Sequence, residues 1–200
     1  MALPSKISEF ISKVGQGVKP NMFQVEINFP VNLGATPDKS VINLLCKSAA
    51  LPGSNLGVIE VPFRGRTVKI AGDRTFDTWS PTFIVDRNMN TRALFETWME
   101  RINGHAGNTA ALIEPNNSAG YTADILVHQL EKGATSTESN YIRTYKLWYA
   151  FPTNVSQIDL AYDSNDQIEE FSVEFQYSYW TTDEGKNPVS AGLPISSDVV

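Results

Sequence analysis

The feature that most constrains the fold is a strict alternation of apolar and polar residues in residues 167–180, QIEEFSVEFQYSYW. Successive side chains of a β-strand point to opposite faces of its sheet, so a period of two predicts a strand with one buried face and one wet face. The wet face contains no Lys or Arg. The core face carries Phe171, Val173, Phe175, Tyr177 and Tyr179, and the wet face carries Glu170, Ser172, Glu174, Gln176 and Ser178.

Other strand-like stretches can supply the sheet that such a strand needs. Residues 22–29, MFQVEINF, alternate in the same way. Pro62 and Gly65 weaken the stretch 58–70, which favours a sheet edge or a projecting ribbon. The remaining predicted strands are residues 41–49, 76–85, 121–131, 141–149 and 156–162, and the predicted turns include residues 132–140, 151–155 and 163–166.

Two segments have helical spacing instead. Residues 91–103 carry an apolar stripe, with Asn90 or Thr91 as the N-terminal cap and Gly104 in the C′ position. Residues 5–14 form a short amphipathic helix that Ser5 caps and Gly15 ends. We therefore predict a mainly β fold, an antiparallel β-sandwich or barrel with one main flanking α-helix and a short N-terminal helix.

The charge balance excludes a broad nucleic-acid-binding surface. Lys and Arg number 16 against 22 Asp and Glu, which gives a net charge of −6, whereas phosphate binding needs clustered basic residues. The only cysteine, Cys46, lies in the apolar run VINLLCK and is predicted to be a buried small hydrophobe, not a reactive thiol. No stretch has the length of a membrane span or the apolar core of a signal peptide, so we expect a soluble protein made in a reducing compartment.

The sequence offers little support for catalysis. His105 and His128 have no Cys, Asp or second His at metal-ligand spacing, and no nucleophile-elbow sequence is present. Because Glu169 and Glu170 are adjacent on a strand, their side chains face opposite ways and do not share a proton. We predict no metal site, no cofactor and no enzymatic activity, and we place His128 at a surface or an interface.

The stretch 71–79, AGDRTFDTW, concentrates charge beside two large aromatic residues. On a strand Asp73 and Arg74 point apart, so each is expected to pair with a different group, including one in another chain. The competing interpretation is a solvated turn.

Several stretches, taken in order, resemble the tail tube proteins of contractile-tailed bacteriophages of the T4 type. KPNMFQVEI is similar to the opening strand of that family, and ALFETWMERING is similar to its helix. The central block CKSAALPGSNLGVIEVPFRGRTVKIAGDRTFDTWSPTFIVD and the closing meander FPTNVSQIDLAYDSNDQIEEFSVEFQYSYW complete the match, which covers most of residues 18–180.

The resemblance implies a subunit of six-membered rings that stack into the inner tube of a contractile tail, through which DNA is ejected into the host. It implies contacts with a sheath protein, baseplate proteins, a tail terminator and a tape measure protein in the lumen. The implied location is the virion tail, assembled in the host cytoplasm. The predicted lumen-facing residues are Glu170, Ser172, Glu174 and Gln176, and the predicted subunit or ring interface consists of Arg64, Arg66, Gly72, Asp73, Arg74, Phe76 and Asp77.

The expected organisation is an N-terminal helical arm at 1–17, a β-domain at 18–180 and a C-terminal extension at 181–200. The extension and the loops 30–40 and 105–120 are longer than the family resemblance implies. Alternative interpretations are a tube protein of a non-phage contractile injection or type VI secretion system, a baseplate tube initiator, and, from a different class, a monomeric β-sandwich binding module.

Overall fold

The computed structural model describes residues 7–15, 17–33, 39–115, 120–131, 141–163 and 165–183. Strands dominate the described chain, which confirms the predicted mainly β fold class. In chain order the elements are α1 (Ile7–Val14), β1 (Phe23–Asn28), the 3-10 helix η1 (Val31–Leu33), α2 (Lys39–Leu44), β2 (Cys46–Ser48), β3 (Asn55–Phe63), β4 (Arg66–Thr75), β5 (Thr82–Ile84), α3 (Asn90–Ile102), β6 (Ala123–Leu130), β7 (Tyr141–Val155), β8 (Glu170–Gln176) and β9 (Tyr179–Asp183).

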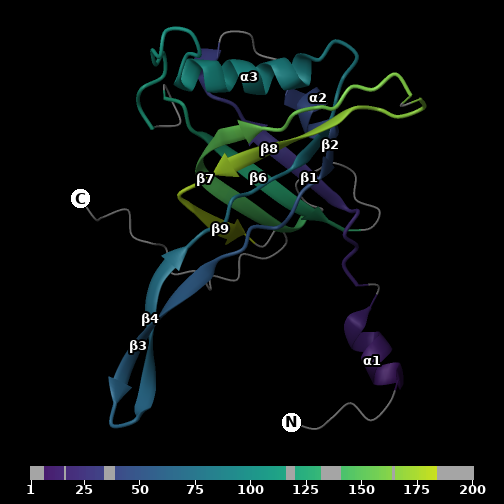
Figure 1. The fold of residues 1–200 in the computed structure, drawn as a ribbon. Helices are drawn as coiled ribbons and strands as arrows, with labels where there is room; N and C mark the ends of the chain where they lie inside the picture. Colours follow the sequence, from purple (N-terminus) through teal and green to yellow (C-terminus); the bar gives the residue numbers. More distant parts are fainter. Residues whose placement is uncertain are drawn as a thin grey trace.

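A curled antiparallel sheet forms the body, and a separate two-stranded hairpin projects from it (Figure 1). The sheet has the order β1-β6-β7-β8-β5-β2, with β9 paired to β7. The long strand β7 joins the two halves, because its residues up to Ala150 pair with β6 and β9 while Phe151–Val155 pair with β8. Tyr149 has a φ of 55°, and this left-handed residue lies just before the strand changes partners.

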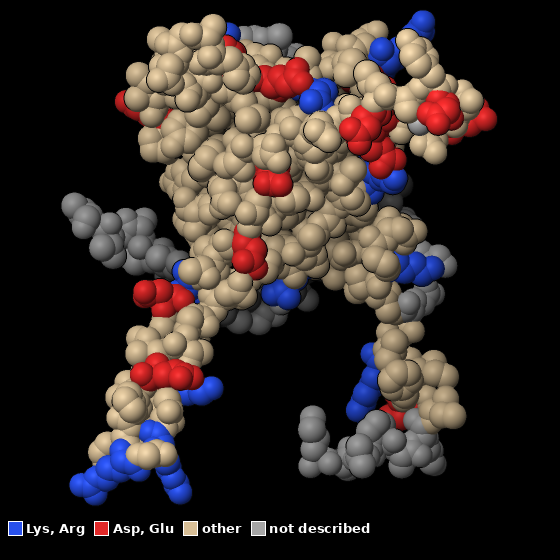
Figure 2. Space-filling view, viewed as in Figure 1, with Lys and Arg blue, Asp and Glu red and all other residues tan. Residues whose placement is uncertain are grey.

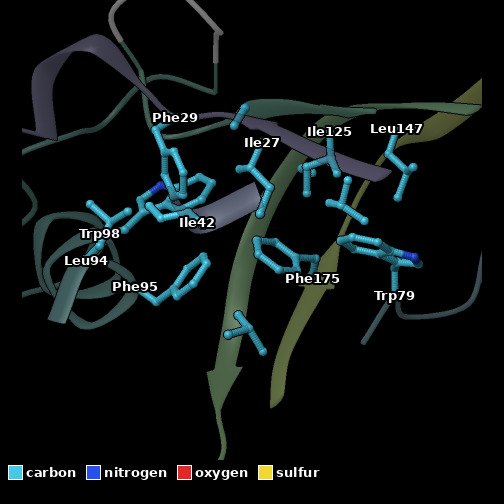
Figure 3. Packing of buried hydrophobic residues seen from close by; sticks show 14 of the residues in the cluster. Ile27, Phe29, Ile42, Trp79, Leu94, Phe95, Trp98, Ile125, Leu147 and Phe175 are labelled. Carbon is cyan, nitrogen blue, oxygen red and sulfur yellow. The ribbon is translucent and has the colours of Figure 1, made fainter. Parts of the chain in front are cut away.

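Helix α3 covers the concave side of the sheet and closes one core. Phe95 and Trp98 are fully buried. The Phe95 ring contacts Phe83 and Phe171 with ring centroids 5.1 and 6.1 Å apart, which fixes the helix against β5 and β8. Figure 3 shows Phe95, Trp98 and Leu94 of α3 converging with Phe29 and Phe175 from the sheet side. All buried hydrophobic residues of the described chain belong to this cluster apart from Tyr141.

The alternation in residues 167–180 is confirmed for its central part and wrong at its end. Phe171, Val173 and Phe175 are buried, as is Tyr177 just beyond β8. The strand stops at Gln176, however, and β9 begins at Tyr179 on the other half of the sheet. Tyr179 is therefore exposed and stacks on Trp148, instead of facing the core.

Four predicted elements are corrected. Residues 41–49 are not one strand but the end of α2 followed by β2, because Ile42 alone is buried and Asn43 Oδ1 accepts a hydrogen bond from the backbone of Ile27. Residues 156–162 form no strand, and residues 151–155, predicted as a turn, extend β7. Strand β5 covers only Thr82–Ile84 of the predicted 76–85.

The two helices are confirmed, although the main helix is capped differently. At the start of α3 the cap position is occupied by Met89, with φ 56° and no side-chain cap. Asp86 performs this role from outside the helix, since its Oδ1 accepts a hydrogen bond from Thr91 N at 2.8 Å. At the other end Asn103 is the C-cap in an extended conformation, so Gly104 holds the predicted C′ position, although its φ is not positive. Gly15 ends α1 with φ 56° as expected, and Ser5 lies outside the described residues.

Candidate assembly surfaces

The β3–β4 hairpin is almost entirely solvent-exposed although many of its side chains are apolar. Every residue of its two strands except Gly72 is exposed. The predicted irregular strand 58–70 is thus two strands joined at Arg64 and Gly65, and the ribbon prediction holds. A two-stranded ribbon without a covering layer is only marginally stable in water. Its exposed large hydrophobic residues are Leu56, Val58, Ile59, Val61, Phe63, Val68 and Ile70.

The end of the hairpin is basic. Arg64 and Gly65 form the turn with φ values of 44° and 81°. The Arg64 guanidinium lies 5.4 Å from the centroid of the Phe63 ring, in a cation–π contact. Lys69 and Glu60 pair with each other at 3.5 Å, and neither Arg64 nor Arg66 at the tip has an ion pair with another described residue. Figure 2 shows Lys and Arg side chains gathered at the end of this projection.

The stretch AGDRTFDTW crosses from the hairpin into the core. Trp79 is buried, and its indole Nε1 donates to Ala50 O at 2.7 Å. Phe76 is half-buried, with its ring centroid 5.8 Å from that of Tyr177. Asp77 accepts two hydrogen bonds from the side-chain amide of Asn55. Phe76, Asp77 and Trp79 therefore anchor the base of the hairpin to the body.

The remaining charges of this stretch face outward. Asp73 and Arg74 are exposed, and neither side chain has a hydrogen bond or ion pair with any other described residue. Gly72 allows the two strands to approach, because an added Cβ would lie 3.2 Å from the backbone of Gly57. The predicted interface residues thus form two groups, Arg64 and Arg66 at the tip and residues 72–77 at the root.

The wet face of β8 is present and polar. Gln176 Nε2 donates to Thr78 Oγ1 at 2.7 Å, and Glu174 Oε1 accepts from Asn154 Nδ2 at 3.3 Å. Glu170 binds Lys47 of β2 through both carboxylate oxygens, at 2.5 and 2.7 Å. A lysine from β2, which lies beyond β5 in the sheet, therefore compensates the carboxylate of Glu170. The sequence of residues 167–180 alone did not predict this ion pair. Ser172 is half-buried beside Thr82 of β5.

Neither histidine forms a catalytic or metal site in the described structure. His128 is buried, which corrects the predicted surface position: its ring stacks on Tyr141 with centroids 4.1 Å apart, and Nδ1 lies 2.9 Å from Thr144 Oγ1. His105 is exposed and pairs with Glu100. Among the described residues there is no cluster of three or more His, Cys, Asp or Glu suited to a metal ion, and no helix has the length and apolarity to cross a membrane.

Cys46 is half-buried, and burial raises the pKa of its thiol to about 12. The thiol is protonated at neutral pH, and a protonated thiol is a poor nucleophile. This agrees with its predicted role as a packing residue.

One surface was missed at the sequence level. The loop between β7 and β8, residues 156–169, exposes Leu160, Tyr162 and Ile168 beside several carboxylates. These residues were predicted as a strand and a turn, so their exposed apolar side chains were not recognised. The sequence did contain a signal for an acidic surface, because no Lys or Arg occurs from residue 147 to residue 185.

This fold is shared with chains of an extracellular contractile injection system. The chain shares its fold with a chain of the cryo-EM structure of the anti-feeding prophage baseplate, 6-fold symmetrised, with a TM-score of 0.58, 14% identity and coverage of 94% of this chain and 100% of that one. It also matches a chain of an extracellular contractile injection system, the PVC sheath-tube complex in the extended state, with a TM-score of 0.55, 17% identity and coverage of 90% and 99%.

Sequence comparison identifies the family. The model of the phage tail tube protein family matches residues 18–183. The chain is 35% identical to the tail tube protein gp19 of Enterobacteria phage T4 over 166 residues, which is 83% of this chain and 92% of that protein. The chain belongs to the phage tail tube protein family, which confirms the main functional interpretation over the non-phage alternatives.

Proposed function

We propose that six copies of this chain close into a ring and that the rings stack into the inner tube of a contractile phage tail. The observation that carries the proposal is the β3–β4 hairpin, whose apolar side chains are exposed although the body already has a complete core. Exposed apolar surface of this extent marks a protein-binding site. A ring with different upper and lower faces stacks without limit, so one projecting element suffices to connect successive rings.

Ring closure gives the sheet edges a partner. Strands β1 and β2 end the sheet, and unpaired edges of this kind invite pairing with another chain. In this arrangement the wet face of β8, with Glu170, Ser172, Glu174 and Gln176, faces the lumen. A face without clustered cations lets DNA pass without binding, because phosphates are held by Lys and Arg.

The N-terminal helix is a second assembly element in this proposal. Helix α1 stands away from the body (Figure 1), and Ile7, Phe10, Ile11 and Val14 are all exposed on it. An amphipathic helix of eight residues is not stable alone, so its apolar stripe requires a surface. We assign residues 1–17 to a helical arm that docks on a neighbouring subunit, residues 18–180 to the tube domain and residues 181–200 to an extension, of which 184–200 lie outside the described part.

The proposed partners follow from the position of a tube inside a tail. The tube contacts the sheath on its outer surface, the baseplate and the tail terminator at its ends, and a tape measure protein in its lumen. The structural relatives come from a baseplate and from a sheath-tube complex, which supports the first two contacts. We further propose assembly in the host cytoplasm and no enzymatic role.

Sedimentation velocity over a range of concentrations, combined with Arg74→Ala, tests this function. We expect wild-type protein to form hexamers and longer particles as the concentration rises, and Arg74→Ala to shift the distribution toward smaller species. Lys19→Ala, an exposed cation near the N-terminal arm, is the matched control. Assemblies that never exceed a single subunit, even with baseplate components added, would refute the proposal.

A further inference from the structure

The acidic loop between β7 and β8 forms a hollow whose lining mixes polar and apolar side chains. Ile158, Leu160, Tyr162 and Ile168 line it together with the acidic residues Asp159 and Glu169. Leu160, Tyr162 and Ile168 are 80%, 109% and 71% exposed, so these large side chains have almost no cover within the subunit. The hollow therefore combines apolar contact area with negative charge.

The root of the loop is held firmly, which presents the hollow in a defined position. Ser156 and Ser172 exchange hydrogen bonds: Ser156 N donates to Ser172 O, and Ser172 N donates to Ser156 Oγ, both at 2.9 Å. From α3, Arg92 Nη1 donates to Ser156 O at 2.8 Å. At the returning end, Val85 N donates to Glu169 O at 3.0 Å. A preorganised loop loses little conformational entropy when a partner binds.

The tip of the hairpin has the complementary chemistry. It presents one exposed aromatic ring, Phe63, which contacts Arg64 and lies opposite Arg66 across the hairpin. Neither arginine has an ion pair within the described part of the chain. Figure 1 places the loop and the hairpin tip at opposite ends of the molecule, and Figure 2 shows acidic side chains on the loop and basic ones on the tip. Because the two sites lie at opposite ends of one subunit, a contact between them requires a second copy of the chain.

We propose that the hollow lined by residues 157–162 and 167–170 is the receptor for the hairpin tip of a second copy of this chain in the next ring. Phe63 contacts the apolar side chains of the hollow, and Arg64 and Arg66 pair with carboxylates that include Asp159 and Glu169. Lys47 compensates Glu170 at the edge of the hollow, whereas Asp159 and Glu169 on the loop have no ion pair with another described residue. This inference rests on the proposed stacking of rings and names the partner surfaces.

Charge reversal tests the pairing, because the two sites lie on the same chain. Variant A carries Arg64→Glu and Arg66→Glu, and variant B carries Asp159→Arg and Glu169→Arg. We expect each variant alone to form rings but about tenfold fewer stacks than wild type, the loss expected when opposed charges become like charges. Mixing A with B restores stacking, because the acidic tip of A meets the basic loop of B and the basic tip of B meets the acidic loop of A.

The control and the readouts separate this inference from the proposed function. Lys19→Glu with Arg87→Glu changes the net charge as much as variant A does, and we expect it to stack normally. Negative-stain electron microscopy counts rings and stacks at low and high salt, and high salt shortens wild-type stacks because it screens exposed charges.

Three outcomes overturn the inference. Normal stacking by A and by B contradicts it and leaves the proposed function intact. Loss of stacking in B alone, reproduced by removal of residues 1–17, assigns the hollow to the N-terminal helix. Absence of rings and stacks from wild-type protein at every concentration overturns the proposed function and this inference together.

Discussion

The side-chain amide of Asn55 donates to both carboxylate oxygens of Asp77, at 3.0 and 2.9 Å, and so joins the first residue of β3 to the segment that follows β4. This contact closes the base of the projecting hairpin. The charges of AGDRTFDTW therefore do not form an active site in the described structure. One of its carboxylates fixes where the hairpin leaves the body, and the neighbouring Asp73 and Arg74 remain available to another subunit.

Replacing Asp77 by alanine tests the role of this contact. Both partners are exposed, so we expect a loss of about 1 kcal/mol or less in the free energy of unfolding, measured by urea denaturation. Amide hydrogen exchange in β3 and β4 should accelerate more than exchange in β6 and β7, because only the hairpin loses its closure. Equal acceleration in both regions would show that Asp77 supports the whole fold.

Alanine substitutions of one buried and one exposed phenylalanine distinguish effects on folding from effects on assembly. Phe95→Ala removes a fully buried ring and should lower the free energy of unfolding by about 3–5 kcal/mol. Phe63→Ala lies on the exposed hairpin tip and should change it by about 0.5 kcal/mol or less while reducing stacking. Urea denaturation measures the first quantity and electron microscopy the second. A destabilising Phe63→Ala would mean that the hairpin packs on its own subunit.

The carboxylate of Asp86, which caps the N-terminus of α3, makes the free energy of unfolding depend on pH. Partial burial pushes the pKa of Asp86 upward, but hydrogen bonds from the backbone and hydroxyl of Thr91 and from the backbones of Asn90 and Asn88 outweigh it and lower the pKa below 3.8. The stabilisation is therefore complete well above pH 3.8 and is lost as the pH falls through the lowered value. Asp86→Ala should cost about 1 kcal/mol at neutral pH.

The acid dependence distinguishes a charged cap from simple packing. The difference between wild type and Asp86→Ala should shrink as thermal or urea unfolding is repeated at decreasing pH below 3.8. A difference that stays constant down to acidic pH would mean that the carboxylate charge contributes nothing at this helix end.

The single thiol reports on folding. Because burial raises the pKa of Cys46 to about 12, the folded protein should react very slowly with a thiol reagent at pH 8, and urea should release fast reaction. Absorbance of the released chromophore follows the reaction. Rapid labelling without denaturant would show that β2 opens readily in the native protein.

The lumen assignment predicts a gain of DNA binding. Gln176→Lys with Glu174→Lys places cations on the wet face of β8, and assembled tubes of this variant should bind DNA with an affinity that falls as salt rises. Lys substitutions at Thr97 and Ala93, exposed on the outer side of α3, are the control and should leave internal DNA retention unchanged. If tubes with Lys at 174 and 176 ignore DNA, β8 does not line the channel.

The sequence predicted most accurately where a single periodicity governed a whole element. The alternation of Phe171, Val173 and Phe175 and the stripe of Leu94, Phe95 and Trp98 each describe one buried face, and both are confirmed. Predictions failed where tertiary contacts decide. Residues 39–44 form a helix because one apolar side chain, Ile42, reaches the core while Asn43 binds the backbone of β1.

Local sequence patterns also could not predict the long-range strand pairing. Strand β7 continues through Pro152 because, after the left-handed residue Tyr149, β8 becomes its partner. This partner lies about twenty residues further along the chain. His128 is buried because Tyr141 stacks on it from the adjacent strand. In the candidate site, the charged residues of the sequence pointed to the hairpin tip and root. The exposed loop between β7 and β8 could not be predicted in this way, because it exists only once β7 and β8 have paired.

The most direct test of the central claim is electron microscopy of the purified protein over a range of concentrations, alone and with baseplate components. We expect sixfold rings that stack into hollow tubes of uniform diameter. Single subunits at every concentration and in both conditions would contradict it.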